Sequence, residues 1–455
     1  MFEGSRGQSV RQALEGKLDE LTAAAVECVT RAMNGSAANV LAAEQAFRDA
    51  VMKAAVSAFE AAVLESDRAM RGALRARGHW GPKGQVCHGR LRSKGVKPTT
   101  VLTLLGEAHV ERWTAKCVTC GRLLGAFEEL FQTVEGMTPG CANSVALAGV
   151  TIAYEPAQKS LIQREGLAVD DNRVKALVDA LGPRATECFQ EMPSPSRRRL
   201  PPKGACVYVM MDGGRIRLRA KGGAWREPCL GLLLWEGPDG KWVKYGISHP
   251  TDKEKVLTVI EQWMKILGPD EEGTEKWEVV IIADGAEWIW NWAAKYPWAI
   301  PILDYYHMKE YLWDAAKALH GEGTPEAAAW VKQKRDILWK GQVYKIEMQF
   351  DQLLLSGTLT KEQEAAIEAA GTYFRNHSKM IAYKKHRKQG RLIGSGAIES
   401  LCKQVFTMRM KGPGMFWSED GAEHLMALRT LYVTNQWESL WEQPIRRITP
   451  LREAC

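Results

Sequence analysis

No apolar stretch of the sequence is long enough to cross a bilayer, and its start lacks the basic-then-apolar pattern of a secretory signal. Cysteine is scarce too. Ten cysteines scattered over 455 residues are too few for a disulfide scaffold and fit a reducing compartment. The phosphate-cradling pattern G-x-x-x-x-G-K-[ST] is also missing, which argues against the use of ATP. We therefore expect a cytoplasmic protein without a membrane anchor.

Carboxylates are almost missing from one long basic stretch. Glu399 is the only acid between Glu368 and Glu419. A lone carboxylate in such surroundings predicts a metal ligand held beside a polyanion, although a solvated basic face is the plain alternative. The basic residues around it are candidates for contact with DNA phosphates: Arg375, Lys379, Lys384, Lys385, Arg387, Lys388, Arg391, Lys403, Arg409 and Lys411.

The chain is longer than one hydrophobic core normally fills, so several domains are expected. The main boundary is predicted in the Pro/Arg-rich linker 191–203, whose prolines oppose regular structure. The other predicted segments are a helical region 1–75, a Cys-containing ribbon-like segment 76–125, a helical segment 126–190, the first part of an α/β core 204–304, a helical insertion 305–390, and a part 391–455 that completes the core.

The region before the linker is predicted to be mainly helical. A long helix from about Val10 to Leu74 is interrupted at residues 34–36. A hairpin follows at residues 100–113. In segment 126–190, a break at Gly166 with Asp170 or Asp171 as the next cap predicts either a helix-turn-helix or a plain helical hairpin.

After the linker the elements come in a definite order. Strands are predicted at residues 205–211, 216–220, 230–236 and 242–247, then a helix at 253–267, a strand at 277–283, a Trp-rich helix and a strand at 300–303. A meander of strands followed by helix, strand, helix and strand is the order of the ribonuclease H fold. A mixed α/β sheet flanked by helices is therefore expected.

Two aspartates end apolar runs in this core: Asp212 after residues 207–211, and Asp284 after residues 279–283. Together with Glu399 they outline an Asp–Asp–Glu site for Mg²⁺, which prefers oxygen ligands. Two such ions can activate a nucleophile and stabilise the leaving oxygen in phosphodiester cleavage. Each residue also has a plain alternative, because Asp212 can be a turn residue, Asp284 a helix cap, and Glu399 a partner of Lys403.

Three motifs carry a resemblance to a known family. Residues 282–290 (IADGAEWIW), 302–307 (ILDYYH) and 394–400 (GSGAIES) resemble the DDE transposases of bacterial insertion sequences, and among these the ISKra family. The tail at residues 409–417 is similar to that family as well. The resemblance spans about residues 206–441. It implies a ribonuclease H-like core with an all-helical insertion before the glutamate, and Asp212, Asp284 and Glu399 as the ligands of two Mg²⁺ or Mn²⁺ ions.

The same resemblance implies a function. The protein would bind the terminal inverted repeats of its element, cleave the ends, and join them to target DNA, in the nucleoid and as a dimer or higher oligomer. Two rival hypotheses are a metal-dependent nuclease of the same fold and a domesticated, non-catalytic DNA-binding protein. The intact Asp–Asp–Glu set argues against the second.

One feature leaves the second aspartate open. Asp304-x-x-His307 resembles a short signature of several transposase groups, and Asp304 also ends an apolar strand. Asp304 is therefore a rival of Asp284, which we prefer because a longer strand precedes it. His307 is expected either to orient DNA or Glu399, or to be a core histidine.

Cysteine and tryptophan add two further hypotheses. Cys117-x-x-Cys120 looks like one half of a zinc ribbon, and the other half is represented by Cys87 and His88. These four residues can hold zinc, or the ribbon can persist without metal. Among the 17 tryptophans, most are expected in the core, and Trp288 and Trp417 are the candidates for DNA contact.

Overall fold

The computed structural model describes residues 11–12, 14–34, 37–80, 86–125, 127, 133–194, 199–219 and 224–442. The chain divides into two compact units, residues 1–183 with 441–455, and residues 184–440. The division falls within helix α7 (Asp171–Glu191), just before the predicted linker, of which residues 195–198 lie outside the described part. Both units mix helices and strands, so the α/β class is confirmed. Within the described ranges, no helix has the length and apolar character of a membrane span.

The first unit begins with the interrupted helix that the sequence predicts. Helix α2 (Leu18–Asn34) and helix α3 (Ala37–Arg77) flank the break, whose residues 35 and 36 are outside the described part. Two short paired strands, β1 (His79–Trp80) and β2 (Val86–Cys87), come next. A three-stranded antiparallel sheet follows, formed by β3 (Leu91–Thr103), β4 (Gly106–Cys117) and β5 (Leu123–Gly125). The predicted hairpin is therefore confirmed, with longer strands.

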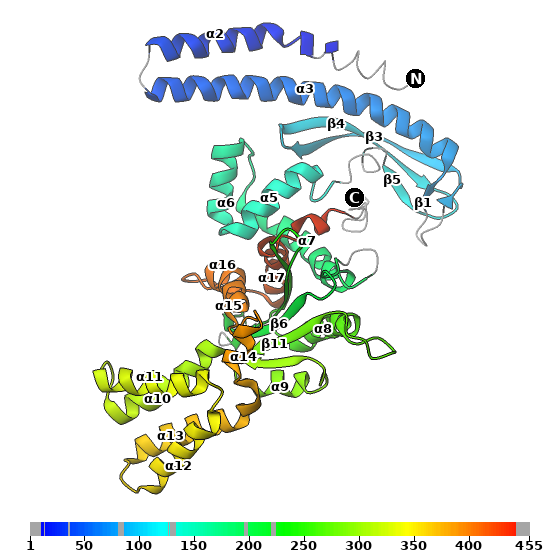
Figure 1. Cartoon of the computed structure of the whole chain (residues 1–455). Helices are drawn as coiled ribbons and strands as arrows, with labels where there is room; N and C mark the ends of the chain where they lie inside the picture. The colour runs from blue at the N-terminus through cyan, green and yellow to red at the C-terminus, as the bar shows by residue number, and fades with distance from the viewer. Residues whose placement is uncertain are drawn as a thin grey trace. The chain divides into compact units, whose positions relative to one another are not determined.

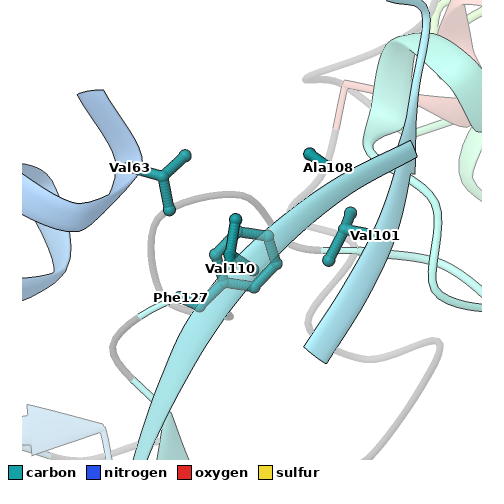
Figure 2. Close-up of a cluster of buried hydrophobic side chains, with 5 residues drawn as sticks. All are labelled: Val63, Val101, Ala108, Val110 and Phe127. Carbon is teal, nitrogen blue, oxygen red and sulfur yellow. The ribbon is translucent and has the colours of Figure 1, made fainter. Parts of the chain in front are cut away.

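Helix α3 packs against this sheet through a small apolar core, drawn in Figure 2. Strand β4 alternates buried and exposed positions, so Ala108 and Val110 face the helix while their neighbours face water. Val63 of α3 closes the core from the helix side. The five buried members are Val63, Val101, Ala108, Val110 and Phe127.

The segment predicted as helix, turn and helix has that form. It contains α5 (Pro139–Thr151), α6 (Tyr154–Ser160), a π-helical turn (Leu161–Glu165) and α7. Gly166 ends the π-turn in the left-handed region at φ 72°, where glycine is favoured. The Asp170 side chain accepts a hydrogen bond from the Arg173 amide at 2.9 Å and so caps α7. Binding of DNA by this segment remains a prediction.

The second unit is built on a five-stranded mixed sheet. The strands are β6 (Cys206–Gly213), β9 (Cys229–Glu236), β10 (Trp242–His249), β11 (Glu278–Ala283) and β12 (Ile300–Leu303). Their spatial order is β10-β9-β6-β11-β12. The first three are antiparallel neighbours, whereas β11 runs parallel to both β6 and β12. The strands predicted at residues 205–211, 230–236, 242–247, 277–283 and 300–303 are confirmed to within about two residues at each end. The strand predicted at residues 216–220 is instead the short β7 (Ile216–Arg217), which lies outside this sheet and pairs with β8 (Trp225–Arg226).

Helices cover both faces of the sheet, which explains why β6 and β11 are continuously apolar. On one face, α8 (Lys253–Leu267) approaches so closely that a Cβ at Gly231 would lie 2.5 Å from Ile260. The opposite face is covered by α17 (Glu419–Val433), where a Cβ at Gly246 would lie 2.7 Å from Thr430. Glycine at these two positions therefore sets the distance between the sheet and its helices.

A helical insertion separates β12 from the rest of the core, as predicted. It contains α10 (Tyr305–His320), α11 (Pro325–Trp339), α12 (Val343–Leu355), α13 (Lys361–Asn376), a 3₁₀ turn (Ser378–Met380) and α14 (Tyr383–Lys388). Helices α10 to α13 lie together as a bundle beside the core, drawn in yellow tones in Figure 1. The remaining elements are α9 (Glu287–Ala293), α15 (Gly396–Cys402), a π-turn (Lys403–Thr407), α16 (Met408–Met410) and a terminal 3₁₀ turn (Trp437–Leu440).

The chain returns from this insertion through a short segment that is fixed to the sheet. Arg391 is buried and pairs with Glu278 at the start of β11, with Nε to Oε1 at 2.7 Å. The Leu392 amide donates to the Tyr208 hydroxyl of β6 at 3.0 Å. Arg391 therefore anchors the insertion to the sheet, and we remove it from the predicted DNA-binding residues.

This ion pair should contribute to stability in a pH-dependent way. The hydrogen bonds from Arg391 hold the pKa of Glu278 below its ordinary value of 4.5. A lowered pKa means that the contribution is complete above the ordinary pKa and is lost as pH falls through the folded value. Because the Glu278 side chain is 38% exposed, water screens the pair. We expect Glu278→Gln to lower the free energy of unfolding by about 1 kcal/mol at neutral pH.

Urea unfolding of the native chain and of Glu278→Gln, measured from neutral to acid pH, tests this. The difference between the two proteins should shrink as Glu278 becomes protonated. Glu236→Gln is the matched control, since Glu236 is exposed at the end of β9. A difference that stays constant with pH would show that the pair does not contribute in this way.

Candidate functional site

Three neighbouring parallel strands each lead into an aspartate at the same edge of the sheet. Ile282 of β11 pairs with Met210 of β6, and Ala283 of β11 pairs with Leu303 of β12. The same register, continued along the chain, aligns Asp284 with Asp212 on one side and with Asp304 on the other. Because adjacent strands lie about 4.8 Å apart, three carboxylates line one edge of the sheet.

Asp304 uses its carboxylate inside the protein. The side chain is completely buried. One oxygen accepts hydrogen bonds from the amides of Tyr306 and His307, the latter at 2.7 Å, and so caps helix α10. The other oxygen accepts a hydrogen bond from the Ser395 amide. With three backbone donors on two oxygens, Asp304 has the environment of a structural cap.

Asp212 and Asp284 have freer carboxylates. Asp212 accepts a hydrogen bond from the amide of Gly213 at 2.7 Å, and Asp284 accepts one from the amide of Ala286 at 3.0 Å. Burial raises the pKa of Asp212, and the negative charge of Asp284 raises it further. The two carboxylates therefore repel each other, and a bound cation would relieve that repulsion.

Glu399 reaches the same edge from helix α15. Its side chain is 45% exposed, and the Ser395 hydroxyl donates to its Oε1 at 2.9 Å. His307 lies beside it, with Nδ1 at 4.0 Å from Glu399 Oε1 and 3.9 Å from Asp304 Oδ1. The donor atoms of Asp304, His307 and Glu399 all lie within 4.8 Å of one another, close enough to hold a metal ion. His307 is 38% exposed, so it is not a core histidine.

Cys402, on the same helix as Glu399, lies near both Asp212 and Glu399. Burial raises the pKa of its thiol, and the charges of Asp212 and Glu399 both contribute. The thiol also forms a hydrogen bond with Asp212. The Cys402 thiol is therefore close enough to both Asp212 and Glu399 for their charges to affect its pKa. Among the described residues, Glu399 forms no ion pair with Lys403, the partner that the sequence offered as an alternative.

Ser395 is the residue of this site that the sequence reasoning missed. Its amide contacts Asp304 and its hydroxyl contacts Glu399, so it connects a strand-end aspartate to the glutamate. A signal was present, because serine four residues before glutamate at the start of a helix places both side chains on one face.

The predicted DNA-binding cations fall into two groups. Most are exposed, on α13, the 3₁₀ turn after it, α14 and the segment that follows Glu399: Arg375, Lys379, Lys384, Lys385, Arg387, Lys388, Lys403 and Lys411. Two are buried. Arg391 pairs with Glu278, and the guanidinium of Arg409 lies 5.4 Å from the Trp417 ring centroid. Within the exposed group, Arg375 lies 3.7 Å from an oxygen of Asp351, and contact of the group with phosphates stays a prediction.

The two tryptophans proposed for DNA contact are both half-buried. The Trp417 indole donates to the Met410 carbonyl at 3.0 Å, which ties it to helix α16. Trp288 lies on α9, with the Lys253 ammonium 5.2 Å from its ring centroid. Trp417 is thus engaged mainly in holding its own segment.

A second group of donors lies in the first unit. His79 faces the three thiols of Cys87, Cys117 and Cys120, and the four donor atoms lie within 4.8 Å of one another. His79 Nε2 is 3.3 Å from Cys120 Sγ, and the Cys87 and Cys117 sulfurs are 3.8 Å apart. The predicted fourth member, His88, is instead exposed. The pairing of β1 with β2, which sets His79 opposite Cys87, accounts for the difference.

No family model matches this chain, and no curated protein matches it either. The interpretation of both sites therefore rests on their geometry.

The contacts of Asp304 and Asp284 predict losses of stability of different size when the charge is removed. Asp304→Asn should lower the free energy of unfolding by about 2 kcal/mol, because an amide nitrogen cannot accept from the Ser395 amide. Asp284→Asn should cost less than about 1 kcal/mol, since it relieves repulsion with Asp212 and affects a single backbone hydrogen bond. Denaturant unfolding in a metal chelator measures both. The reverse ranking would show that Asp284 is the structural residue.

Proposed function

We propose that the protein is a DDE-type DNA transposase, which binds the ends of its element, cleaves them and joins them to target DNA. The observation that carries the proposal is the edge of the sheet at which Asp212 and Asp284 are in register and Glu399 arrives from a helix. The strand order supports it as well. Three antiparallel strands followed by two parallel ones, with an all-helical insertion before the glutamate, agree with the ribonuclease H-like core implied by the family resemblance.

The donors at this edge suit Mg²⁺ or Mn²⁺, which prefer carboxylate oxygens. Asp212, Asp284 and Glu399 would hold the ions, and the repulsion that raises the pKa of Asp212 is what a cation would relieve. When bound, two such ions supply an activated oxygen nucleophile and charge stabilisation for the leaving oxygen. Asp304 is not part of this set in our proposal, because its oxygens already accept three backbone hydrogen bonds.

Two neighbouring residues position the glutamate. Ser395 donates to Glu399 Oε1 and so restricts the rotation of that carboxylate. His307 lies 4.0 Å from the same oxygen and is partly exposed, so it can donate to Glu399 or to a DNA phosphate. Partners that orient a metal ligand in this way typically contribute tenfold to hundredfold to affinity or activity.

The exposed cations of α13 and α14 give the site a substrate preference. Lys384, Lys385, Arg387 and Lys388 form an almost continuous basic turn on α14, a few residues before the segment that leads to Glu399. Such a surface binds DNA phosphates with an affinity that falls steeply with salt. Two DNA ends have to be brought together for transposition, so the proposal also includes a dimer or higher oligomer.

Substitution of the triad tests the catalytic proposal. We expect Asp212→Asn, Asp284→Asn and Glu399→Gln each to reduce Mg²⁺-dependent cleavage by roughly 10³-fold, because several kcal/mol of charge stabilisation is lost. Ser395→Ala should lower it by about 10-fold to 100-fold. The substrate is the DNA that flanks the gene, cut from a plasmid and followed on denaturing gels.

Asp239→Asn is the control, since Asp239 lies in the exposed turn between β9 and β10. Full cleavage by any of the three triad variants would contradict the assignment. Joining of a cut 3′ end to a second DNA distinguishes a transposase from a nuclease, which would release cut ends without joining them.

We also propose that the first unit holds a zinc ion through His79, Cys87, Cys117 and Cys120. Two sulfurs that share a tetrahedral zinc at about 2.3 Å are about 3.8 Å apart. The Cys87 and Cys117 sulfurs have this separation. The amide of Gly89 points at Cys87 Sγ and that of Cys120 at Cys117 Sγ, both at 3.4 Å. Such donors favour the thiolate, which is the form that binds metal. Zinc here would connect β1 and β2 to the end of β4.

Zinc content separates His79 from His88. The native chain should contain about one zinc per molecule. His79→Ala and Cys120→Ser should lose most of it and unfold at lower temperature, whereas His88→Ala should keep both the metal and the stability. Metal analysis of purified protein and thermal unfolding with and without a chelator measure this. Zinc retained by His79→Ala and lost by His88→Ala would restore the assignment made from the sequence.

A further inference from the structure

A small hairpin directly after Asp212 carries arginines on one face. Its strands are β7 (Ile216–Arg217) and β8 (Trp225–Arg226), which pair antiparallel. Ile216 and Leu218 point inward and are at most 5% exposed. The alternate positions are exposed and are all arginine: Arg215, Arg217 and Arg219. The Arg219 Nε donates a hydrogen bond to the Phe416 carbonyl at 3.1 Å. No carboxylate pairs with them among the described residues.

Two aromatic rings lie beside these arginines and remain open to solvent. Trp225 is 58% exposed and Phe416 is 37% exposed. The guanidinium of Arg217 lies between them, 4.6 Å from the Phe416 ring centroid and 6.0 Å from that of Trp225. We call Arg215, Arg217, Arg219, Trp225 and Phe416 the arginine–aromatic face.

Contacts with the segments that carry Asp212 and Glu399 hold this face in place. It begins three residues after Asp212. Gly214 packs against Phe406, where a Cβ would lie 2.4 Å from the ring, and Phe406 belongs to the π-turn that continues the helix of Glu399. A second contact comes from the segment of Trp417, because the Arg219 amide donates a hydrogen bond to the Trp417 carbonyl at 2.7 Å. The face is therefore held next to the elements that carry Asp212 and Glu399.

We propose that the arginine–aromatic face binds an unpaired strand of DNA next to the phosphate to be cut. This inference rests on the proposed function, since it assumes a DNA substrate. An open ring flanked by arginines offers stacking to bases and charge to phosphates, which is the combination that single-strand binding uses. A duplex hides its base faces, so it would contact the arginines but leave Trp225 and Phe416 unused. The face would hold the strand that separates from the duplex at the end of the element.

An aromatic ring beside arginine is also typical of protein–protein contacts. Charge favours DNA here, because three outward arginines without carboxylate partners complement a polyanion. Contact with a second copy of the chain is one outcome of the test below, and it would overturn the proposal.

The test measures binding by the full chain in chelator, so that no cleavage is needed. The probes are a labelled oligo(dT) of about twelve nucleotides and a blunt duplex, followed by fluorescence anisotropy. Trp225→Ala and Phe416→Ala should each weaken binding of the oligo(dT) by about 5-fold to 150-fold, the range for loss of one stacked base. Duplex binding should change less than about twofold, and Trp225→Phe should restore most of the affinity.

Trp242→Ala is the matched control. Trp242 is 45% exposed but lies at the start of β10, at the opposite end of the sheet from Asp212. It should leave both affinities unchanged. Arg215→Gln should lower the salt dependence of oligo(dT) binding by about 0.7 in the logarithmic slope, as for loss of one phosphate contact. Circular dichroism of each variant confirms that it is folded.

The outcomes separate this inference from the proposed function. If the native chain binds neither probe, the proposal of a DNA-processing protein fails. If it binds both probes but Trp225→Ala and Phe416→Ala change neither affinity, or weaken both equally, only the arginine–aromatic face is wrong. A change in sedimentation of these variants with unchanged DNA binding would assign the face to contact between copies instead.

Discussion

The buried carboxylate of Asp304 is the constraint on which the arrangement of the second unit depends. It caps α10, where the helical insertion begins, and it accepts the amide of Ser395, where the chain has returned from that insertion. The two ends of an insertion of more than eighty residues are thereby held at one strand end. Arg391 and Leu392 secure the same return to β11 and β6. Because Glu399 follows Ser395 by four residues, these contacts also restrict the position of Glu399.

This constraint explains why three aspartates in equivalent positions do not share one role. The sheet register makes Asp212, Asp284 and Asp304 neighbours, but their backbone surroundings differ. The carboxylate of Asp304 accepts hydrogen bonds from three backbone amides, so its oxygens are already engaged within the protein. By contrast, burial raises the pKa of Asp212, and the charge of Asp284 raises it further, so a nearby cation would lower it again. Structural and metal-binding carboxylates can therefore be distinguished by the donors around them.

The sequence predicted the core well because its elements are local and strongly patterned. Apolar runs placed β6 and β11, and the helical period placed α8 with the bounds that the structure has. What it could not predict depends on contacts distant in sequence. Nothing local in the sequence marks Arg391 as the partner of Glu278, so the basic stretch alone predicts it as a DNA-binding residue. His88 is adjacent to Cys87 in the sequence, whereas His79 lies eight residues upstream, and only the two-residue pairing of β1 with β2 sets His79 opposite Cys87. The sequence predicts DNA contact by Trp417 and not by the more exposed Trp225, because the exposure of a side chain depends on tertiary packing.

Acidic and basic side chains are separated around the strand ends of the second unit. Carboxylates gather at the strand ends and repel each other, and two of the cations that surround Glu399 in the sequence have partners elsewhere. Arg391 is turned toward Glu278 at the far end of β11, and Arg409 lies over Trp417. If lysine or arginine neutralised the triad internally, the site would have no affinity for divalent ions. For the proposed function, separating acids from bases within one short stretch would keep this end of the sheet able to bind metal ions and leave the surrounding surface attractive to phosphates. On the proposed function, the isolation of Glu399 in the sequence has a physical reason, because a second acid beside it would weaken attraction to DNA phosphates and an internal cation would compete with the metal ions.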